Sequence, residues 1–183
     1  KYGGTIDKFI GDSVMIFFGD PDTKGAKEDA IACCQMAMEM LTFLESNQQH
    51  FQEMYNFPEK LEIRVGIHNG LCNVGNFGSA QRLDYTAIGR AVNVAARLEQ
   101  AAPKNSILVS SAVRNLIKNK FETSSPIEVK AKGIDKPIAS YVLTRQDPLN
   151  VKVIKELDGL KLEYDPNKID KNKLLQIIGE LEN

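Results

Sequence analysis

Hydrophobic and polar positions alternate in several short segments of the chain, which predicts strands at those segments. Residues 5–10 alternate between apolar and polar positions, and residues 13–18 form an apolar run of strand length. Gly11 and Asp12 interrupt the two segments. This arrangement predicts a hairpin with Asp12 at its turn.

Helical spacing replaces the alternation elsewhere. Apolar side chains recur at helical spacing over about residues 25–55, which predicts one long helix that Pro58 closes. Residues 61–68 alternate again, and Asn69 with Gly70 predicts a two-residue hairpin turn into the next strand. Further elements are expected as strands at 82–89, 107–110, 127–133 and 138–143, and as helices at 90–101 and about 111–119. This mixture indicates an α+β fold.

The composition changes near residue 146, where the sequence becomes charged and sparsely apolar. We therefore expect one domain at 1–146 and a C-terminal extension at 147–183. The extension is expected to contain a short strand at 151–154 and a short amphipathic helix between about 169 and 181. Two roles for this helix stay open, packing on its own domain or forming a docking or coiled-coil tail.

Charge and cysteine content narrow the classes of partner and compartment. The 183 residues are 43% hydrophobic and 26% charged, and 23 Lys and Arg balance 24 Asp and Glu to a net charge of −1. The chain lacks the broad basic field that binds nucleic acid or anionic membranes, and it has no apolar run of the roughly 20 residues that a membrane span needs. Three cysteines without metal-ligand spacing predict reduced core thiols, which fits a cytoplasmic location.

Three polar residues are candidates for chemistry. Asp12 beside Gly11 suits a hard cation such as Mg²⁺ that also contacts phosphate oxygens, although an Asp at a turn often only bonds its own backbone. Asn93 and Arg97 lie four residues apart and share one face of the expected helix, where Arg matches phosphate and Asn can hold a sugar oxygen. The alternative for this pair is a solvated helix face.

Four segments in order resemble the motifs of the class III nucleotidyl cyclases: DKFIGDSVMIFFG, IRVGIHNG, GNFGSAQRLDYTAIGRAVNVAARLE and VKAKG. The resemblance extends from the first residues to about Leu143. It implies a ferredoxin-like α+β fold with a central, mostly antiparallel sheet flanked by helices. The first strand and helix of that fold, with the first of two metal-binding Asp residues, are expected to precede Lys1.

The resemblance implies that ATP is converted to 3′,5′-cyclic AMP and pyrophosphate with two Mg²⁺ or Mn²⁺ ions. Asp12 matches the second metal-binding Asp. Lys8 matches the residue that donates to N1 of adenine, where guanylyl members typically carry Glu. Thr86 matches the residue that accepts from the adenine 6-amino group, and it resembles a subclass in which several members respond to bicarbonate.

The resemblance also assigns phosphate and sugar contacts. Asn93 is expected to orient the ribose and Arg97 to stabilise charge at the α phosphate. Arg64 and Lys130 match positions that hold the outer phosphates, and both have the alternative of being mere surface charges. Arg90 replaces an acidic residue that is common in the motif.

The family geometry implies a homodimer with two shared sites. Asp12 and Arg64 are expected from one subunit, and the other subunit is expected to supply Lys8, Thr86, Asn93, Arg97 and Lys130. Regulatory domains are expected elsewhere in the parent protein. Two alternatives to an adenylyl cyclase stay open, a non-catalytic cyclase-like module that binds nucleotide or dimerises, and a guanylyl cyclase.

Overall fold

The chain forms two compact units in the computed structural model, Lys1–Thr144 and Arg145–Asn183. The structure describes all residues except 80, 130–136, 145–152, 158–159 and 165–183. Lys130 and the expected C-terminal helix lie outside the described residues. In the second unit, strands β9 (Val153–Leu157) and β10 (Leu160–Tyr164) pair in antiparallel fashion.

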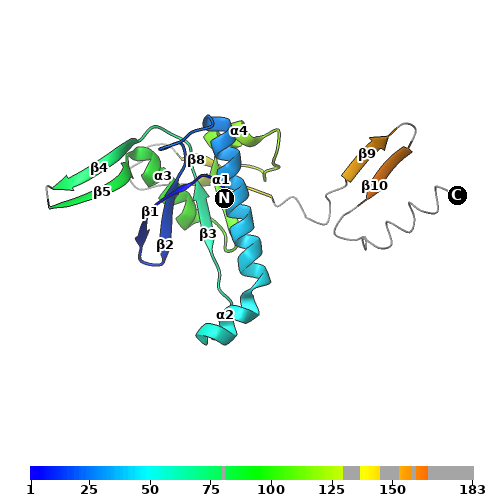
Figure 1. Ribbon diagram of the computed structural model, residues 1–183, viewed down its shortest axis with the longest axis horizontal. Coiled ribbons are helices and arrows are strands. Elements are labelled where there is room, and N and C mark those ends of the chain that lie inside the picture. Colours follow the sequence, from blue (N-terminus) through cyan, green and yellow to red (C-terminus); the bar gives the residue numbers. More distant parts are fainter. Residues whose placement is uncertain (80, 130–136, 145–152, 158–159, 165–183) are drawn as a thin grey trace. The chain divides into compact units, whose positions relative to one another are not determined.

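Strands and helices alternate along the first unit (Figure 1). Its strands are β1 (Thr5–Ile10), β2 (Ser13–Phe17), β3 (Arg64–Ile67), β4 (Asn73–Ser79), β5 (Arg82–Ile88), β6 (Ser106–Ser110), β7 (Ile127–Val129) and β8 (Ile138–Val142). Its helices are α1 (Ala26–Ser46), α2 (Gln48–Tyr55), α3 (Arg90–Ala101) and α4 (Ser111–Ile117). In the described part of the chain, no helix combines the length and the apolar character that crossing a membrane requires.

The central sheet has four strands in the order β3-β6-β8-β7. Strand β3 pairs with β6 in parallel, and the other two pairings are antiparallel. Strand β6 is buried on both faces. Successive side chains of a strand point in opposite directions, so neighbouring β6 residues pack into different cores. Its residues Ile107 and Val109 join one hydrophobic core, and Leu108 joins a second.

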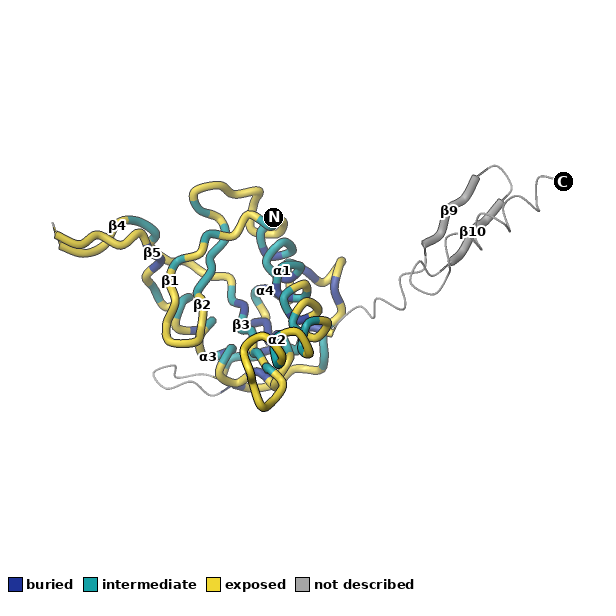
Figure 2. Tube along the Cα trace, turned by 60° about the horizontal axis from the view of Figure 1, so that its bottom comes forward, coloured by how far each residue is buried: buried dark blue, intermediate teal, exposed yellow. Residues whose placement is uncertain are grey.

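The two cores place helices on opposite faces of the sheet. Helices α1 and α4 cover the face of Ile107 and Val109, where α1 contributes Ala30, Cys34, Ala37 and Leu41. Figure 2 shows this buried stripe along α1. Helix α3 covers the opposite face through Val94 and Leu98. The architecture is therefore α+β, and the central sheet is mostly antiparallel, as the resemblance implies, with one parallel pairing between β3 and β6.

Helix α3 lies directly against β3 because residue 66 is glycine. A Cβ atom built on Gly66 would lie 2.2 Å from the Glu99 nitrogen and 2.3 Å from the Ala95 oxygen, both in the α3 backbone. Such distances leave no room for any side chain, which is the usual reason for glycine inside a strand that another backbone approaches closely. Gly66 thus sets the position of α3, the helix that carries Asn93 and Arg97.

Two hairpins extend from this framework. Strands β1 and β2 pair with Gly11 and Asp12 at the turn, as expected, and β4 pairs with β5. The β4–β5 hairpin projects from the sheet, and most of its residues are exposed (Figure 2). Strand β1 contacts β5, so the two hairpins meet.

Two expectations from the sequence are wrong. The single helix at 25–55 is broken at Asn47, because the side chain of Asn47 donates to the Phe43 carbonyl at 2.8 Å and Gln48 bonds both backbone groups of Leu61. Asn69 and Gly70 do not form a hairpin turn, because β3 pairs with β6 and β4 pairs with β5.

We expect Gly66→Ala to lower the free energy of unfolding by about 1–3 kcal/mol, because its methyl group forces α3 away from β3. Chemical denaturation measures the difference. The matched control is Gly75→Ala in β4, where a Cβ atom would meet its nearest neighbour, Phe77, at 3.9 Å. Equal stability of the two variants would contradict the close packing of α3 on β3.

Candidate active site

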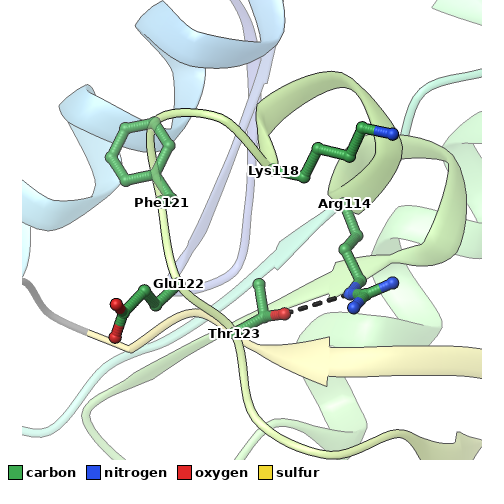
Figure 3. Close-up of a pocket in the computed structure, with 5 residues that line it drawn as sticks. All are labelled: Arg114, Lys118, Phe121, Glu122 and Thr123. Atoms are coloured by element: carbon green, nitrogen blue, oxygen red, sulfur yellow. Dashed lines mark hydrogen bonds between the residues drawn. The ribbon is translucent and has the colours of Figure 1, made fainter.

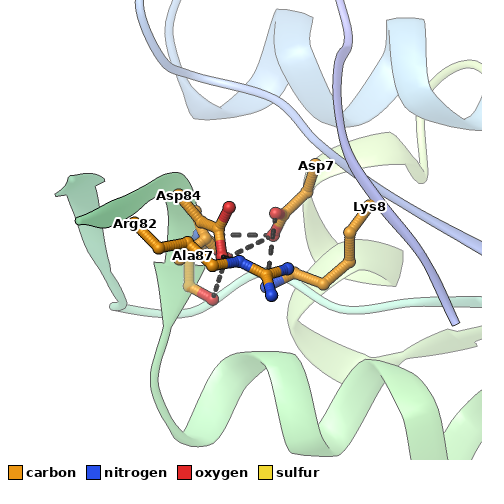
Figure 4. A network of polar contacts seen from close by, with 6 residues as sticks. Asp7, Lys8, Arg82, Asp84 and Ala87 are labelled. Carbon is orange, nitrogen blue, oxygen red and sulfur yellow. Dashed lines mark hydrogen bonds and ion pairs between the residues drawn. The ribbon is translucent and has the colours of Figure 1, made fainter. Parts of the chain in front are cut away.

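Lys8 and Thr86 converge on one carboxylate, that of Asp7. The Thr86 hydroxyl donates to Asp7 Oδ2 at 2.8 Å, and the Ala87 backbone N–H donates to the same oxygen at 3.3 Å. The Lys8 Nζ lies 3.5 Å from Asp7 Oδ1. Figure 4 shows the Asp7 carboxylate directed from β1 towards Ala87 in β5. The structure therefore brings together the two residues that the sequence assigns to the adenine base.

A bulge in β1 creates this arrangement. The β1–β2 register runs from the Ile6 and Ile16 pair directly to the Lys8 and Met15 pair, so Asp7 has no partner in β2. A bulged residue leaves the ladder and can direct its side chain elsewhere. Only 1% of the Asp7 side chain is exposed, whereas 44% of the Lys8 side chain is.

Asp12 occupies the exposed turn of the same hairpin, after β1 and before β2. Its side chain makes no hydrogen bond or ion pair with the residues that the structure describes. Within those residues, no group of three His, Cys, Asp or Glu side chains gathers where a metal ion would bind. Asp12 is thus available as an oxygen ligand for a metal ion. The described residues of the first unit do not supply the further ligands that a metal site needs.

Helix α3 presents Asn93 and Arg97 one turn apart. Asn93 is exposed and makes no side-chain hydrogen bond with the described residues. Arg97 donates to Gln100 Oε1 at 2.8 Å. Phosphate, which can form charge-assisted hydrogen bonds with a guanidinium, is a stronger partner for Arg97 than this neutral amide oxygen.

Arg64, at the start of β3, reaches the same end of α3. Its Nε lies 3.5 Å from Glu99 Oε1, and its Nη1 donates to the Gln100 carbonyl at 3.5 Å. Arg64 and Arg97 therefore contact the same residue of one chain. The sequence predicted the two arginines to act in different half-sites, and the described contacts do not test that division.

His68 and the cysteines are set apart from these residues by their environments. His68 Nδ1 and Ser110 Oγ share a hydrogen bond of 2.9 Å, and burial lowers the pKa of His68. Burial raises the pKa of Cys33 and of Cys34 to about 12. The expectation that all three cysteines lie in the core is wrong, because Cys72 is exposed.

A hollow beside α4 contains none of the predicted site residues. It is lined by Arg114, Lys118, Phe121, Glu122 and Thr123 (Figure 3). The Arg114 Nε donates to Thr123 Oγ1 at 3.1 Å, and its guanidinium lies 4.6 Å from the ring centre of Tyr141. Arg114 already has these partners within the chain, so we assign the hollow to the packing around α4 and not to the site.

Asp7 is the important residue that the sequence analysis missed. Aspartate is unfavourable within strands, and Asp7 lies in the interior of the segment TIDKFI, which was predicted to be a strand. An aspartate inside a predicted strand was the signal by which the sequence could have identified Asp7 as a site residue. Its partner, Thr86, lies in a distant part of the sequence, so the contact itself is not visible in local patterns.

Comparison with known proteins identifies the family. The protein-family model of the adenylate and guanylate cyclase catalytic domain matches residues 5–145 of this chain. The chain therefore belongs to the class III cyclase catalytic domain family. An adenylate cyclase of Anabaena cylindrica is 35% identical over 144 residues, which cover 76% of this chain and 28% of that protein.

Solved structures agree with this assignment. The adenylyl cyclase CyaB from P. aeruginosa has a TM-score of 0.75 and 44% sequence identity, covering 80% of this chain and 75% of that chain. The guanylyl cyclase Cya2 has a TM-score of 0.71 and 29% identity, covering 78% of this chain and 70% of that chain. The chain spans little more than a quarter of the Anabaena relative.

We expect iodoacetamide at pH 8 to modify Cys72 in the native protein and to leave Cys33 and Cys34 unmodified. Cys72 is exposed, and a thiol with a pKa near 12 carries very little thiolate at that pH. Peptide mass spectrometry after timed quenching measures the three rates. All three should react in guanidinium chloride, and equal native rates would contradict the burial of the α1 thiols.

Proposed function

We propose that this chain is the catalytic domain of an adenylyl cyclase, which converts ATP to 3′,5′-cyclic AMP and pyrophosphate. The observation that carries the proposal is the meeting of Lys8 and Thr86 at Asp7. Adenine has an acceptor at N1 beside a donor, the 6-amino group. An ammonium beside a hydroxyl oxygen complements that pair.

Guanine has the opposite pattern, with a donor at N1 and an acceptor at O6. The Lys8 ammonium can only donate, so it is mismatched with guanine N1. This mismatch argues for the adenylyl reaction over the guanylyl reaction. The guanylyl reaction is the alternative because the chain is also similar to the guanylyl cyclase Cya2. The 44% identity to CyaB supports the same choice.

Asp12 fits the role of a metal ligand. Carboxylate oxygen is the ligand type that Mg²⁺ and Mn²⁺ prefer, and Asp12 is exposed without a partner among the described residues. We propose that a second carboxylate comes from a segment N-terminal to Lys1, as the family pattern implies. Bound metal ions would make the ribose 3′ hydroxyl more acidic and neutralise charge on the pyrophosphate.

The reaction is a displacement at the α phosphorus. The ribose 3′ oxygen forms a bond to the α phosphorus and loses its proton, while the bond to the bridging oxygen of pyrophosphate breaks. Arg97 would stabilise the negative charge that develops on the α phosphate oxygens, and Asn93 would orient the ribose. Arg64 and Lys130 would hold the outer phosphates.

We propose that two copies of the chain share each site. Large apolar side chains are exposed on both hairpins, including Phe9 at 74% exposure. Ile6 and Ile10 accompany it on β1, and Leu83 and Ile88 are exposed on β5. Contiguous exposed apolar surface is typical of protein interfaces. A homodimer would bury these side chains and bring Asp12 of one copy to Arg97 of the other.

The remaining parts of the proposal concern location and control. The α1 thiols are free, with Cys34 buried and Cys33 half-buried, which fits a reducing compartment, so we place the domain in the cytoplasm. Regulatory domains in the parent protein would control dimer geometry, and Thr86 makes bicarbonate a candidate activator. A non-catalytic module is the second candidate function, and it is disfavoured by the joint presence of Lys8, Asp12, Asn93 and Arg97.

We expect Asp12→Asn and Arg97→Ala to abolish activity separately and to restore it when combined in mixed dimers of the full-length protein. Each single change should lower cyclic AMP formation by about a hundredfold or more. In an equal mixture, half of the dimers are mixed and each contains one intact site, so about a quarter of the wild-type activity should return. Differently tagged subunits allow the mixed dimers to be purified and assayed with ATP and Mn²⁺.

The matched control combines Asp12→Asn with Arg64→Ala. These two residues are assigned to the same half-site, so each mixed dimer would still contain two damaged sites and should stay inactive. Recovery in this control, or none with Arg97→Ala, would refute the shared site. No cyclic AMP from the wild-type protein would favour the non-catalytic module.

Lys8→Glu combined with Thr86→Ala should shift the preference from ATP towards GTP. Glutamate accepts from guanine N1, and alanine removes the oxygen that opposes guanine O6. We expect the ratio of kcat/KM for ATP over GTP to fall by at least about tenfold. Lys24→Glu, an equal charge change in an exposed loop, should leave that ratio unchanged; an unchanged ratio in the double variant would refute the base assignment.

A further inference from the structure

We infer that Asp7 determines which nucleotide base the site accepts, by fixing the direction of the Thr86 hydroxyl and the position of the Lys8 ammonium. This inference rests on the proposed function. In the proposed reaction, Asp7 contacts no reacting atom of the nucleotide. It acts as a positioning residue through its two neighbours.

The argument starts from the proton of Thr86. A hydroxyl has one proton to donate, and an ionised carboxylate can only accept. The 2.8 Å bond to Asp7 Oδ2 therefore uses the one proton of Thr86. The hydroxyl oxygen is left able to accept but not to donate. It can pair with the 6-amino group of adenine and repels the O6 carbonyl of guanine.

Burial makes this direction persistent. Thr86 is 4% exposed, so water has little access to its hydroxyl, and the Ala87 carbonyl oxygen, a second acceptor, lies at 3.5 Å, farther away than Asp7 Oδ2 at 2.8 Å. The Ala87 N–H donates to the same Asp7 oxygen at 3.3 Å, which ties the carboxylate to the β5 backbone. A base that contacts Thr86 must therefore pack directly against β1 and β5.

The second carboxylate oxygen controls Lys8. Asp7 Oδ1 lies 3.5 Å from the Lys8 Nζ, and nearly half of the Lys8 side chain is exposed. An unpaired lysine samples many rotamers. The charge of Asp7 restricts the ammonium to the side of the site where Thr86 lies. One buried carboxylate thus sets a donor and an acceptor beside each other.

Asp7→Asn tests the inference because the amide cannot replace both oxygens. If the Asn oxygen accepts from Thr86, the amide NH₂ faces Lys8 and repels the ammonium. If the amide turns round, its NH₂ donates to Thr86, and the Thr86 proton becomes free to donate to guanine O6. Either orientation damages one base contact while keeping the size of the side chain.

We expect Asp7→Asn in the full-length protein to lower the ratio of kcat/KM for ATP over GTP by about tenfold, as for the loss of one hydrogen bond. The change should be mainly in KM, since the reacting phosphates are untouched. Asp84→Asn is the matched control, because Asp84 lies on the strand of Thr86, β5, in an exposed ion pair with Arg82. It should leave the ratio at the wild-type value.

A double-variant comparison separates positioning from a general loss of structure. In a Thr86→Val background the hydroxyl is absent, so Asp7→Asn should change the nucleotide ratio much less than in the wild type. Thr86→Ser, which keeps the hydroxyl, should retain the preference for ATP. An effect of Asp7→Asn in the Thr86→Val background as large as in the wild type would overturn the control of the Thr86 hydroxyl by Asp7, on which the discrimination against guanine O6 rests.

The remaining outcomes are also decisive. If the wild type forms cyclic AMP and Asp7→Asn keeps the same ratio, the inference fails and the proposed function stands. If Asp7→Asn does not fold, an unchanged ratio in Thr86→Val alone overturns the inference, because Asp7 is argued to act through that hydroxyl. If the wild type forms no cyclic nucleotide from ATP or GTP, the proposed function itself fails.

Discussion

A buried carboxylate joins the two hairpins of the first unit. Moving an ionised carboxylate out of water costs several kcal/mol unless hydrogen bonds and an opposite charge compensate it. Asp7 obtains that compensation from Thr86 and Ala87 in β5 and from Lys8 in its own strand. The relative placement of β1 and β5 is therefore under electrostatic control, and the residues proposed to contact the base depend on it.

Gly66 imposes the second constraint, which acts on the packing of α3 against β3. Because β3 has no side chain at this position, α3 packs against its backbone. That contact brings Arg64 of β3 and Arg97 of α3 to the same glutamine. Two contacts thus position proposed site residues within one chain: the polar contact at Asp7 places Lys8 and Thr86, and the close packing at Gly66 places α3 with Arg97.

Local patterns predicted the elements whose pairing partners are close in sequence. The β1–β2 hairpin, β5 and α3 lie where the alternation and helical spacing indicate, and the match of residues 5–145 to the cyclase family agrees with the motifs. The pattern failed where a distant contact decides. Gln48 breaks the long helix by bonding Leu61, and the parallel pairing of β3 with β6 overrides the turn signal of Asn69 and Gly70. Asp7 was missed for the same reason, since its role depends on a contact with Thr86, which is distant in sequence.

The parallel pairing of β3 with β6 has a consequence for how this domain can vary. The crossover between these two strands contains β4, β5 and α3. Its ends are held by the ladder, while the described residues of β4 and β5 lie outside both cores. Substitutions at the exposed positions of β4 therefore leave the sheet intact, and the domain can diversify there during evolution without losing its framework.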